Sequence, residues 1–261
     1  MTLTNVDDYV EFCSYLRKLT GIDLSHYKRP QMERRLRTFY SNKGVNSLTE
    51  AVDRLRNDPA HLEQLLDRIT INVSQLWRNP EQWELIQEKL LPELGQTGQV
   101  RAWSAGCSYG AEAYTLATIC HVVLPGKRVT IHGTDIDKRM VERARLGVFS
   151  NEDARSAPEK LMDIGFERVP DGWRAKLNLR TMTRFDQGDL LQMQLRAASY
   201  DLILCRNTVI YFAEPIRDEL HARLADALRP GGYLVIGSTE RVSSPGELGL
   251  SMQHPFIYRK A

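Results

Sequence analysis

The sequence lacks long apolar runs and any marked excess of charge of one sign. No window of about 18 apolar residues occurs, so a membrane-spanning helix is not expected. The first residues, MTLTNVDDYVEFCSYL, contain no basic segment followed by an apolar core, and a secretory signal is therefore not expected. The 35 Lys and Arg nearly balance the 33 Asp and Glu. Overall charge therefore indicates neither nucleic acid nor a membrane surface as a partner.

Cysteines are few and unpaired in sequence. The four of them stand at positions 13, 107, 120 and 205, and no CxxC pair occurs. We expect reduced thiols in a cytoplasmic protein, because disulfide frameworks belong to oxidising compartments. The six histidines form no HExxH or other ligand spacing, so no metal site is predicted.

The first 70 residues predict a small all-helical domain. Apolar residues recur at helical spacing from Val6 to Thr20, where Gly21 stops the helix. Pro30 suits the first turn of a second helix, and Ser47 with Glu50 fits a capping box. The expected helices run from Val6 to Thr20, from Pro30 to about Gly44, from Ser47 to Arg56 and from Pro59 to Thr70.

After a linker and connecting helix at 71–98, short apolar runs alternate with helical segments through 99–261. The expected strands are 100–104, 129–134, 200–205 and 233–237, and the expected helices are 110–123, 137–146 and 214–228. This alternation predicts an α/β domain with a doubly wound, mostly parallel sheet covered on both faces. Residues 229–232 (RPGG) read as a turn, and about 165–187 as a small β insertion.

The turn after the first strand indicates what kind of ligand the sheet binds. Ligands of open parallel sheets bind where the first strand turns into its helix. Here the turn reads Ala105-Gly106-Cys107-Ser108-Tyr109-Gly110, which lacks the middle glycine of the dinucleotide motif. Tyr109 stands where a pyrophosphate would need room. A cofactor without phosphates therefore fits better than a nicotinamide or flavin dinucleotide.

Two carboxylates extend this argument. Asp135 ends the second strand, where an acid accepts both hydroxyls of a ribose. Asp189 follows a short strand, at a position suited to an adenine edge. Either acid alone could instead be a helix N-cap. Taken in order with the glycine turn, the pattern describes a site for S-adenosylmethionine (SAM).

Five segments together resemble the CheR family of chemotaxis receptor methyltransferases, over nearly the whole chain. They are QMERRL (31–36), INVSQLWR (71–78), WSAGCSYG (103–110), LCRNTVIYF (204–212) and GSTE (237–240). The resemblance implies a class I SAM methyltransferase fold behind the helical domain. It also implies methylation of glutamate side chains on chemoreceptor cytoplasmic helices, with S-adenosylhomocysteine as the product.

The resemblance assigns roles to individual residues. It implies cofactor binding by Asn72, Ser74, Arg78, Gly106, Glu112, Asp135, Asp189, Leu190, Asn207 and Thr208. Within this set Glu112 meets the amino-acid part and Asp135 the ribose. Ser74 stands where the family usually has Thr, and Asp189 where it has Asn. The family turn Thr-Gly-Glu-Glu-Pro-Tyr is here YGAEAY (109–114), a departure that bears on cofactor affinity more than on fold.

Arg78 and Tyr211 are the candidate catalytic residues. A glutamate carboxylate, with a pKa of about 4.3, is already a nucleophile at neutral pH, so no general base is required. Arg78 could orient that carboxylate by a charge-assisted hydrogen bond, or form only a surface ion pair. Tyr211 could line the path of the methyl group, or be a packed aromatic.

The helix expected after Pro30 carries a basic face. Six Lys or Arg stand between residues 28 and 43 against the single acid Glu33. The resemblance implies that Arg34, Arg35 and Arg37 dock the chemoreceptor cytoplasmic domain. A solvated helix face is the plainer alternative, and nucleic acid lacks an adjacent aromatic stacking platform. We expect a monomer that inserts into no membrane, and keep a methyltransferase-fold binding module without catalysis as the second candidate function.

Overall fold

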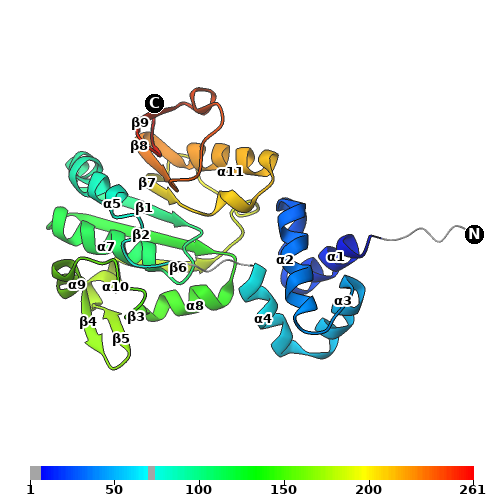
Figure 1. Ribbon diagram of the computed structural model, residues 1–261. Coiled ribbons are helices and arrows are strands. Elements are labelled where there is room, and N and C mark those ends of the chain that lie inside the picture. The colour runs from blue at the N-terminus through cyan, green and yellow to red at the C-terminus, as the bar shows by residue number, and fades with distance from the viewer. Residues whose placement is uncertain (1–6, 70–73) are drawn as a thin grey trace, which may run out of the picture. The chain divides into compact units, whose positions relative to one another are not determined.

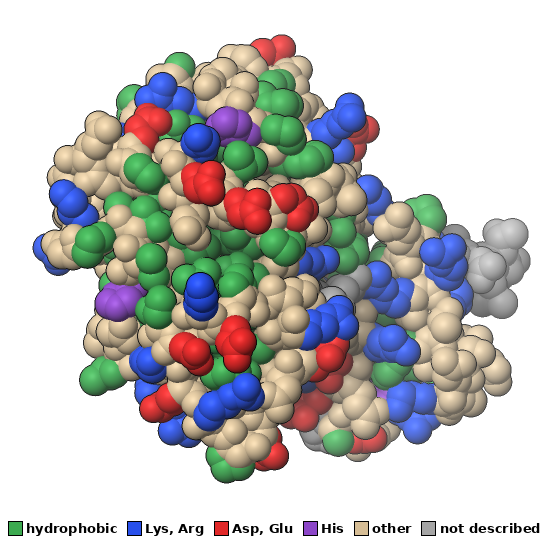
Figure 2. Space-filling view, turned by 60° about the vertical axis from the view of Figure 1, so that its left-hand side comes forward, with side chains coloured by type: hydrophobic (Ala, Val, Ile, Leu, Met, Phe, Trp, Pro, Cys, Tyr) green, Lys and Arg blue, Asp and Glu red, His purple; other side chains and the backbone are tan. Residues whose placement is uncertain are grey.

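The computed structural model describes residues 7–69 and 74–261, which group into two compact units (Figure 1). One unit is helical and includes residues 211–216, and the other holds the sheet. In the described parts of the chain, no helix combines the length and apolar character needed to cross a bilayer. On the face shown in Figure 2, basic and acidic side chains are interspersed over the sheet-containing unit.

The helical unit contains α1 (Asp8–Thr20), α2 (Arg29–Ser41), α3 (Leu48–Asn57) and α4 (Pro59–Ile69), which confirms the four expected helices. The Asp7 carboxylate caps α1 by accepting the N–H of Tyr9 at 3.1 Å. Gly21, at φ +80°, ends that helix. The Ser47 hydroxyl accepts the N–H of Glu50 at 3.1 Å, as predicted. The Glu50 carboxylate bonds the N–H of Asn46, however, so the capping box is shifted by one residue.

Residues 211–216 belong to the helical unit although they follow a strand of the sheet. The N–H of Lys28 donates to the carbonyl of Tyr211 at 3.0 Å, and that of Ala213 to the carbonyl of His26 at 2.8 Å. Tyr27 forms an isolated antiparallel bridge with Phe212. A chain segment distant in sequence thereby completes the edge of the helical unit.

The other unit is built on a seven-stranded sheet in the order β6-β2-β1-β7-β8-β10-β9. The strands are β1 (Gln99–Ala105), β2 (Arg128–Asp135), β6 (Thr183–Gln187), β7 (Tyr200–Cys205), β8 (Leu228–Ile236), β9 (Leu250–His254) and β10 (Ile257–Lys260). Neighbours from β6 to β8 pair in parallel, whereas β10 pairs antiparallel with β8 and with β9. The predicted mostly parallel sheet is confirmed.

Helices connect these strands as expected for a doubly wound sheet. Helix α7 (Ala111–Val123) connects β1 to β2, and α8 (Lys138–Leu146) follows β2. Helix α11 (Glu214–Ala227) connects β7 to β8. Because strand order reverses between β1 and β7, right-handed crossovers place α11 on the opposite face from α7 and α8. Three shorter segments, α5 (Pro80–Leu85), a π-helical turn (Ile86–Leu90) and α6 (Leu91–Leu94), precede β1.

The insertion begins and ends earlier in the chain than predicted. A three-stranded antiparallel sheet forms from β3 (Val148–Ser150), β5 (Gly172–Ala175) and β4 (Phe166–Val169), with α9 (Glu159–Gly165) between β3 and β4 in the chain. The rest of the expected 165–187 insertion is α10 (Leu177–Met182) and β6, which is the edge strand of the main sheet. Leu179 is the buried residue of α10, and Phe185 is that of β6. With one buried residue in each element, the apolar residues show neither a helical nor a strand period, and the sequence did not separate the two elements.

The predicted turn at residues 229–232 lies inside β8. Leu228 pairs with Tyr200 of β7, and the next pair joins Tyr233 to Leu202. The four intervening residues therefore form a bulge, which Gly231 permits at φ +76°. The expectation of a free turn was wrong because pairing resumes on both sides of the bulge.

Candidate functional site

The turn from β1 to α7 has a backbone that few side chains tolerate. Gly106 has φ +80° and Gly110 φ +88°, and Ser108 adopts φ +48° between them. A Cβ atom on Gly106 would lie 2.5 Å from the Thr208 hydroxyl oxygen. The turn therefore requires glycine at this position, and the structure brings the predicted residues Gly106 and Thr208 into contact.

Backbone donors of this turn are already used within the protein. The N–H groups of Gly106 and Cys107 donate to the carbonyl of Thr134 at 2.9 and 3.0 Å. The N–H of Ser108 donates to the Asp135 carboxylate at 2.7 Å. A phosphate cradle needs such N–H groups to be open. Their engagement supports a ligand without phosphates.

Tyr109 packs into the interior of the sheet-containing unit. Its hydroxyl is shared between the carbonyl of Ser74 and the carboxylate of Asp153, the latter at 2.8 Å. Its ring lies 6.2 Å from the ring of Phe149 and 3.9 Å beneath the guanidinium of Arg143. Burial raises the pKa of the Tyr109 phenol. The departure from the family turn is thus accommodated as a core side chain.

Asp135 ends β2 at the same edge as the turn. Its two oxygens accept the N–H groups of Ser108, at 2.7 Å, and of Asp137, at 2.9 Å. Burial raises the pKa of Asp135 to about 6, against these two backbone donors. A carboxylate oxygen has two acceptor sites, so each can take a further donor such as a hydroxyl.

Asp189 and Leu190 lie next to Asp135. The N–H of Gly188 donates to the carbonyl of Asp135 at 2.9 Å. The Asp189 carboxylate accepts the N–H of Leu191 at 2.9 Å, and Leu190 is buried. The residues predicted for the ribose and the adenine therefore share one edge of the sheet.

Glu112 stands in the first turn of α7 with both carboxylate oxygens bonded. One oxygen accepts the Ser104 hydroxyl at 2.7 Å, and the other accepts Arg206 Nη1 at 3.2 Å. Burial raises the pKa of Glu112, while Arg206, Ser104 and the charge of Arg78 act in the opposite direction. The structure therefore brings Arg78 and Glu112 into electrostatic range of one another.

Sequence reasoning missed Arg206, which appears there only within the segment LCRNTVIYF (204–212). Its side chain is 3% exposed and bonds four groups besides packing near Trp83. They are Gln82 Oε1 (2.8 Å), Glu112 Oε2 (3.2 Å), the carbonyl of Arg78 (2.6 Å) and Asn79 Oδ1 (3.3 Å). An arginine directly after a buried apolar strand was the available signal, because a charge there requires several partners.

Glu240 ties the ends of β7 and β8 together. Its carboxylate accepts the N–H groups of Gly237 (2.6 Å), Asn207 (2.9 Å) and Val209 (3.0 Å). These bonds hold Asn207 at φ +59°. The Oδ1 atom of Asn207 is buried and has no hydrogen-bond partner among the residues that the structure describes. An unsatisfied buried acceptor is a group that a bound ligand can satisfy, which fits the predicted cofactor role of Asn207.

Four further groups of predicted residues complete the set. Asn72 falls outside the described residues, and the carbonyl of Ser74 accepts a hydrogen bond from the Tyr109 hydroxyl. Tyr211 belongs to the helical unit, where the Arg35 guanidinium lies 5.7 Å from its ring centre. The remaining basic candidates, Arg34 and Arg37, are exposed on α2.

Arg37 is engaged in a surface ion-pair network. Its guanidinium lies 2.7 Å from the Asp8 carboxylate and 2.8 Å from that of Glu33. Part of the basic face of α2 is therefore neutralised within the helical unit.

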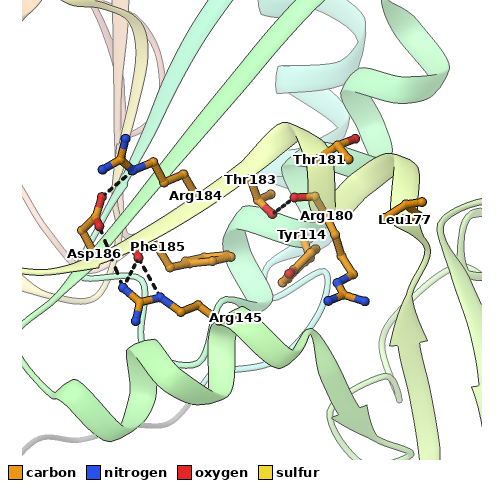
Figure 3. Close-up of a pocket in the computed structure, with 9 residues that line it drawn as sticks. All are labelled: Tyr114, Arg145, Leu177, Arg180, Thr181, Thr183, Arg184, Phe185 and Asp186. Atoms are coloured by element: carbon orange, nitrogen blue, oxygen red, sulfur yellow. Dashed lines mark hydrogen bonds and ion pairs between the residues drawn. The ribbon is translucent and has the colours of Figure 1, made fainter.

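A groove of about 480 Å³ lies at the outer side of β6 (Figure 3). Its lining residues are Tyr114, Arg145, Leu177, Arg180, Thr181, Thr183, Arg184, Phe185 and Asp186. In Figure 3, Arg145 reaches the carbonyl of Phe185, to which it donates at 2.7 and 3.0 Å. None of the predicted cofactor residues lines this groove, so it is separate from the site at the strand ends.

Comparison with known proteins identifies the family of the chain. Residues 72–254 match the family model described as CheR methyltransferase, SAM binding domain, and residues 7–70 match the CheR methyltransferase, all-alpha domain. A chemotaxis protein methyltransferase of Listeria monocytogenes is 32% identical, covering 97% of each chain. Chemotaxis protein methyltransferase 1 of Pseudomonas aeruginosa is 30% identical, covering 91% of each. A third relative, "Probable biofilm formation methyltransferase WspC" of the same organism, is 28% identical over 94% of this chain and 60% of its own.

Proposed function

The chain belongs to the CheR methyltransferase family, and from this premise we propose that it methylates glutamate side chains on the cytoplasmic domains of chemoreceptors. Its cofactor is SAM, the ligand of the domain matched by residues 72–254. The observation that carries the proposal is a pair of carboxylates, the buried Asp135 and the 13% exposed Glu112, beside a turn whose N–H groups are internally bonded. That edge offers acceptors for a cationic, phosphate-free ligand.

The residues present fit SAM, and we assign them to its parts. Glu112 takes the ammonium of the amino-acid end, and Asp135 takes the ribose hydroxyls. Asp189 and Leu190 meet the adenine, and the buried Oδ1 of Asn207 gains a donor. Gly106, Thr208, Arg78, Ser74 and Asn72 complete the proposed cofactor set.

The chain's own contribution to the reaction is binding and orientation. When bound, SAM would supply the methyl group for a carboxylate oxygen, and its sulfur would keep the electron pair of the C–S bond. Arg78 orients the attacking carboxylate through a charge-assisted hydrogen bond, and Tyr211 lines the path of the methyl. No side chain has to accept a proton, because the acceptor is ionised at neutral pH. Catalysis then rests on holding the reacting atoms in line.

We further propose that the protein acts as a monomer in the cytoplasm and docks its receptor through Arg34, Arg35 and Arg37. The four unpaired cysteines support the reducing compartment.

Transfer of labelled methyl from SAM to receptor cytoplasmic fragments tests the proposal. We expect label on the fragment that base releases as methanol, the signature of a methyl ester. A fragment with its acceptor glutamates replaced by glutamine serves as the matched control and should stay unlabelled. Cofactor binding without transfer to any fragment would favour the second candidate, a docking module that has lost catalysis.

A further inference from the structure

Arg206 is a buried cation that joins three separate segments. It follows β7 directly, its Nη1 bonds Glu112 on α7, and its Nη2 bonds the carbonyl of Arg78. Its Nε bonds Gln82, whose own amide donates to the carbonyl of Ile236 at the end of β8 at 3.0 Å. One side chain thus connects the ends of β7 and β8 to the start of α7 and to the segment that carries Arg78.

These contacts define what each partner can do. The carbonyl of Arg78 accepts from both Arg206, at 2.6 Å, and the indole N–H of Trp83, at 3.0 Å. Asn79, next in the chain, has φ +59° and offers its Oδ1 to Arg206 at 3.3 Å. The main chain at Arg78 is therefore fixed by Arg206, while the Arg78 side chain extends from that fixed point.

The charge of Arg206 also matters to Glu112. A carboxyl group buried this deeply is favoured in its neutral form, and a neutral carboxyl binds an ammonium weakly. The charged groups that face Glu112 are Arg206 and Arg78. Ser104 donates one hydrogen bond, and the neighbouring thiols Cys107 and Cys205 are neutral because burial raises the pKa of each. Arg206 is thus the directly bonded cation that favours the ionised form.

We propose that Arg206 is a positioning residue for the amino-acid end of SAM: it keeps Glu112 a carboxylate and fixes the main chain that carries Arg78. The inference rests on the proposed assignment of Glu112 to the cofactor ammonium. It adds a residue that acts through Glu112 and Arg78, with four of its N–H···acceptor contacts made to the protein itself. A surface ion pair, or a core arginine remote from the site, would neither keep Glu112 ionised nor fix the main chain at Arg78.

Two matched variants separate charge from shape. Arg206→Gln removes the charge and keeps hydrogen-bonding capacity, whereas Arg206→Lys keeps the charge and loses the planar fork. Titration calorimetry with SAM should give Arg206→Gln an affinity at least about tenfold weaker at neutral pH. That affinity should recover as pH rises above 7, because a Glu112 that has lost its cationic partner ionises only at higher pH. Arg206→Lys should bind more weakly than wild type with a flat profile over the same range.

Controls keep the test independent of folding. Arg145→Gln, on the outer side of β6, should leave SAM affinity and its pH profile unchanged. Glu112→Gln with Arg206→Gln replaces the ion pair by a neutral pair, and its weak binding should be independent of pH above 7, where Asp135 stays ionised. This double variant and Arg206→Lys carry the test if Arg206→Gln alone fails to give a folded protein by thermal unfolding.

The outcomes are distinct. A pH-dependent loss in Arg206→Gln that disappears in the double variant supports the positioning role. Equal, pH-independent losses in the Gln and Lys variants, or unchanged affinity in both, overturn it. The variants can show these pH profiles while the wild-type protein binds SAM but transfers no methyl to receptor fragments. That result refutes the proposed function and leaves this inference standing.

Discussion

Single residues decide the chemistry at the strand ends, and Asp135 is the clearest case. It is buried at the end of β2, accepts two backbone N–H groups and has a pKa raised to about 6 by burial. Because its folded pKa lies above the unfolded value of 3.8, folding favours its neutral form. That contribution to stability is present below the unfolded pKa and is lost as pH rises through about 6.

Cofactor binding should depend on the ionisation of Asp135. Ribose hydroxyls need the carboxylate as acceptor, so we expect SAM affinity to be constant above pH 7 and to fall as pH drops through about 6. Asp135→Ala should weaken binding by about 1.5–3 kcal/mol and remove this step from the profile. Calorimetric titration over this pH range measures both effects. Asp186→Asn, on the edge strand β6, is the control, and an unaltered affinity in Asp135→Ala would exclude the ribose assignment.

Tyr109 offers a second prediction for a single residue, concerning stability. Tyr109→Phe removes the hydroxyl that reaches Asp153 and the carbonyl of Ser74 but keeps the ring against Phe149. We expect a loss of about 1–2 kcal/mol in the free energy of unfolding, from one buried hydrogen bond and its unsatisfied partners. SAM affinity should change little, because the ring stays packed. Denaturant unfolding and calorimetry together check this, and a large loss of affinity at wild-type stability would contradict it.

At the scale of helices and strands, the sequence predicted what is periodic and missed what is not. The strand β7 was predicted with its observed bounds, because a short apolar run between polar residues indicates a buried strand. The segment 177–187 was misassigned, since Leu179 and Phe185 are isolated buried residues with no repeat around them. The bulge at 229–232 depends on pairing with β7 and has no local signal apart from its glycines.

The same reasoning explains the site. Asp135 ends β2, and Glu112 lies in the first turn of the helix after β1. The order of strands and helices in the chain is enough to place both residues at the carboxyl ends of parallel strands. The contacts of Arg206 with Gln82 and Glu112 span 124 and 94 residues of sequence, so only the folded sheet brings these side chains together.

The helix α2 carries a prediction of its own. Arg37 is held by Asp8 and Glu33, whereas Arg34 is exposed on the same helix. Arg34→Glu should therefore raise the apparent KM for an acidic receptor fragment about 3- to 10-fold at low salt and flatten its salt dependence. Arg56→Glu on α3 reverses charge elsewhere in the unit and should have little effect. SAM affinity should be unchanged in both, and normal methylation by Arg34→Glu at low salt would contradict docking through this face.

At the scale of the whole molecule, the proposed catalytic residues come from different units. Arg78 lies in the sheet-containing unit, with its main chain fixed by Arg206 and Trp83. Tyr211 is grouped with the helical unit, where its carbonyl accepts the N–H of Lys28. The proposed role of each residue can therefore be tested separately, one unit at a time.

Single-turnover transfer measures this directly. Arg78→Ala should slow the transfer step more than it weakens SAM binding, because a cation near a sulfonium can only orient the carboxylate. Tyr211→Phe keeps the ring and loses one hydroxyl, so we expect a rate about fivefold lower, equivalent to about 1 kcal/mol. Tyr233→Phe, which removes the hydroxyl that bonds Glu93 on the far side of β8, is the matched control and should leave the rate unchanged. In a structure with bound S-adenosylhomocysteine, an Arg78 guanidinium or a Tyr211 ring more than about 8 Å from the sulfur would exclude that residue from direct positioning.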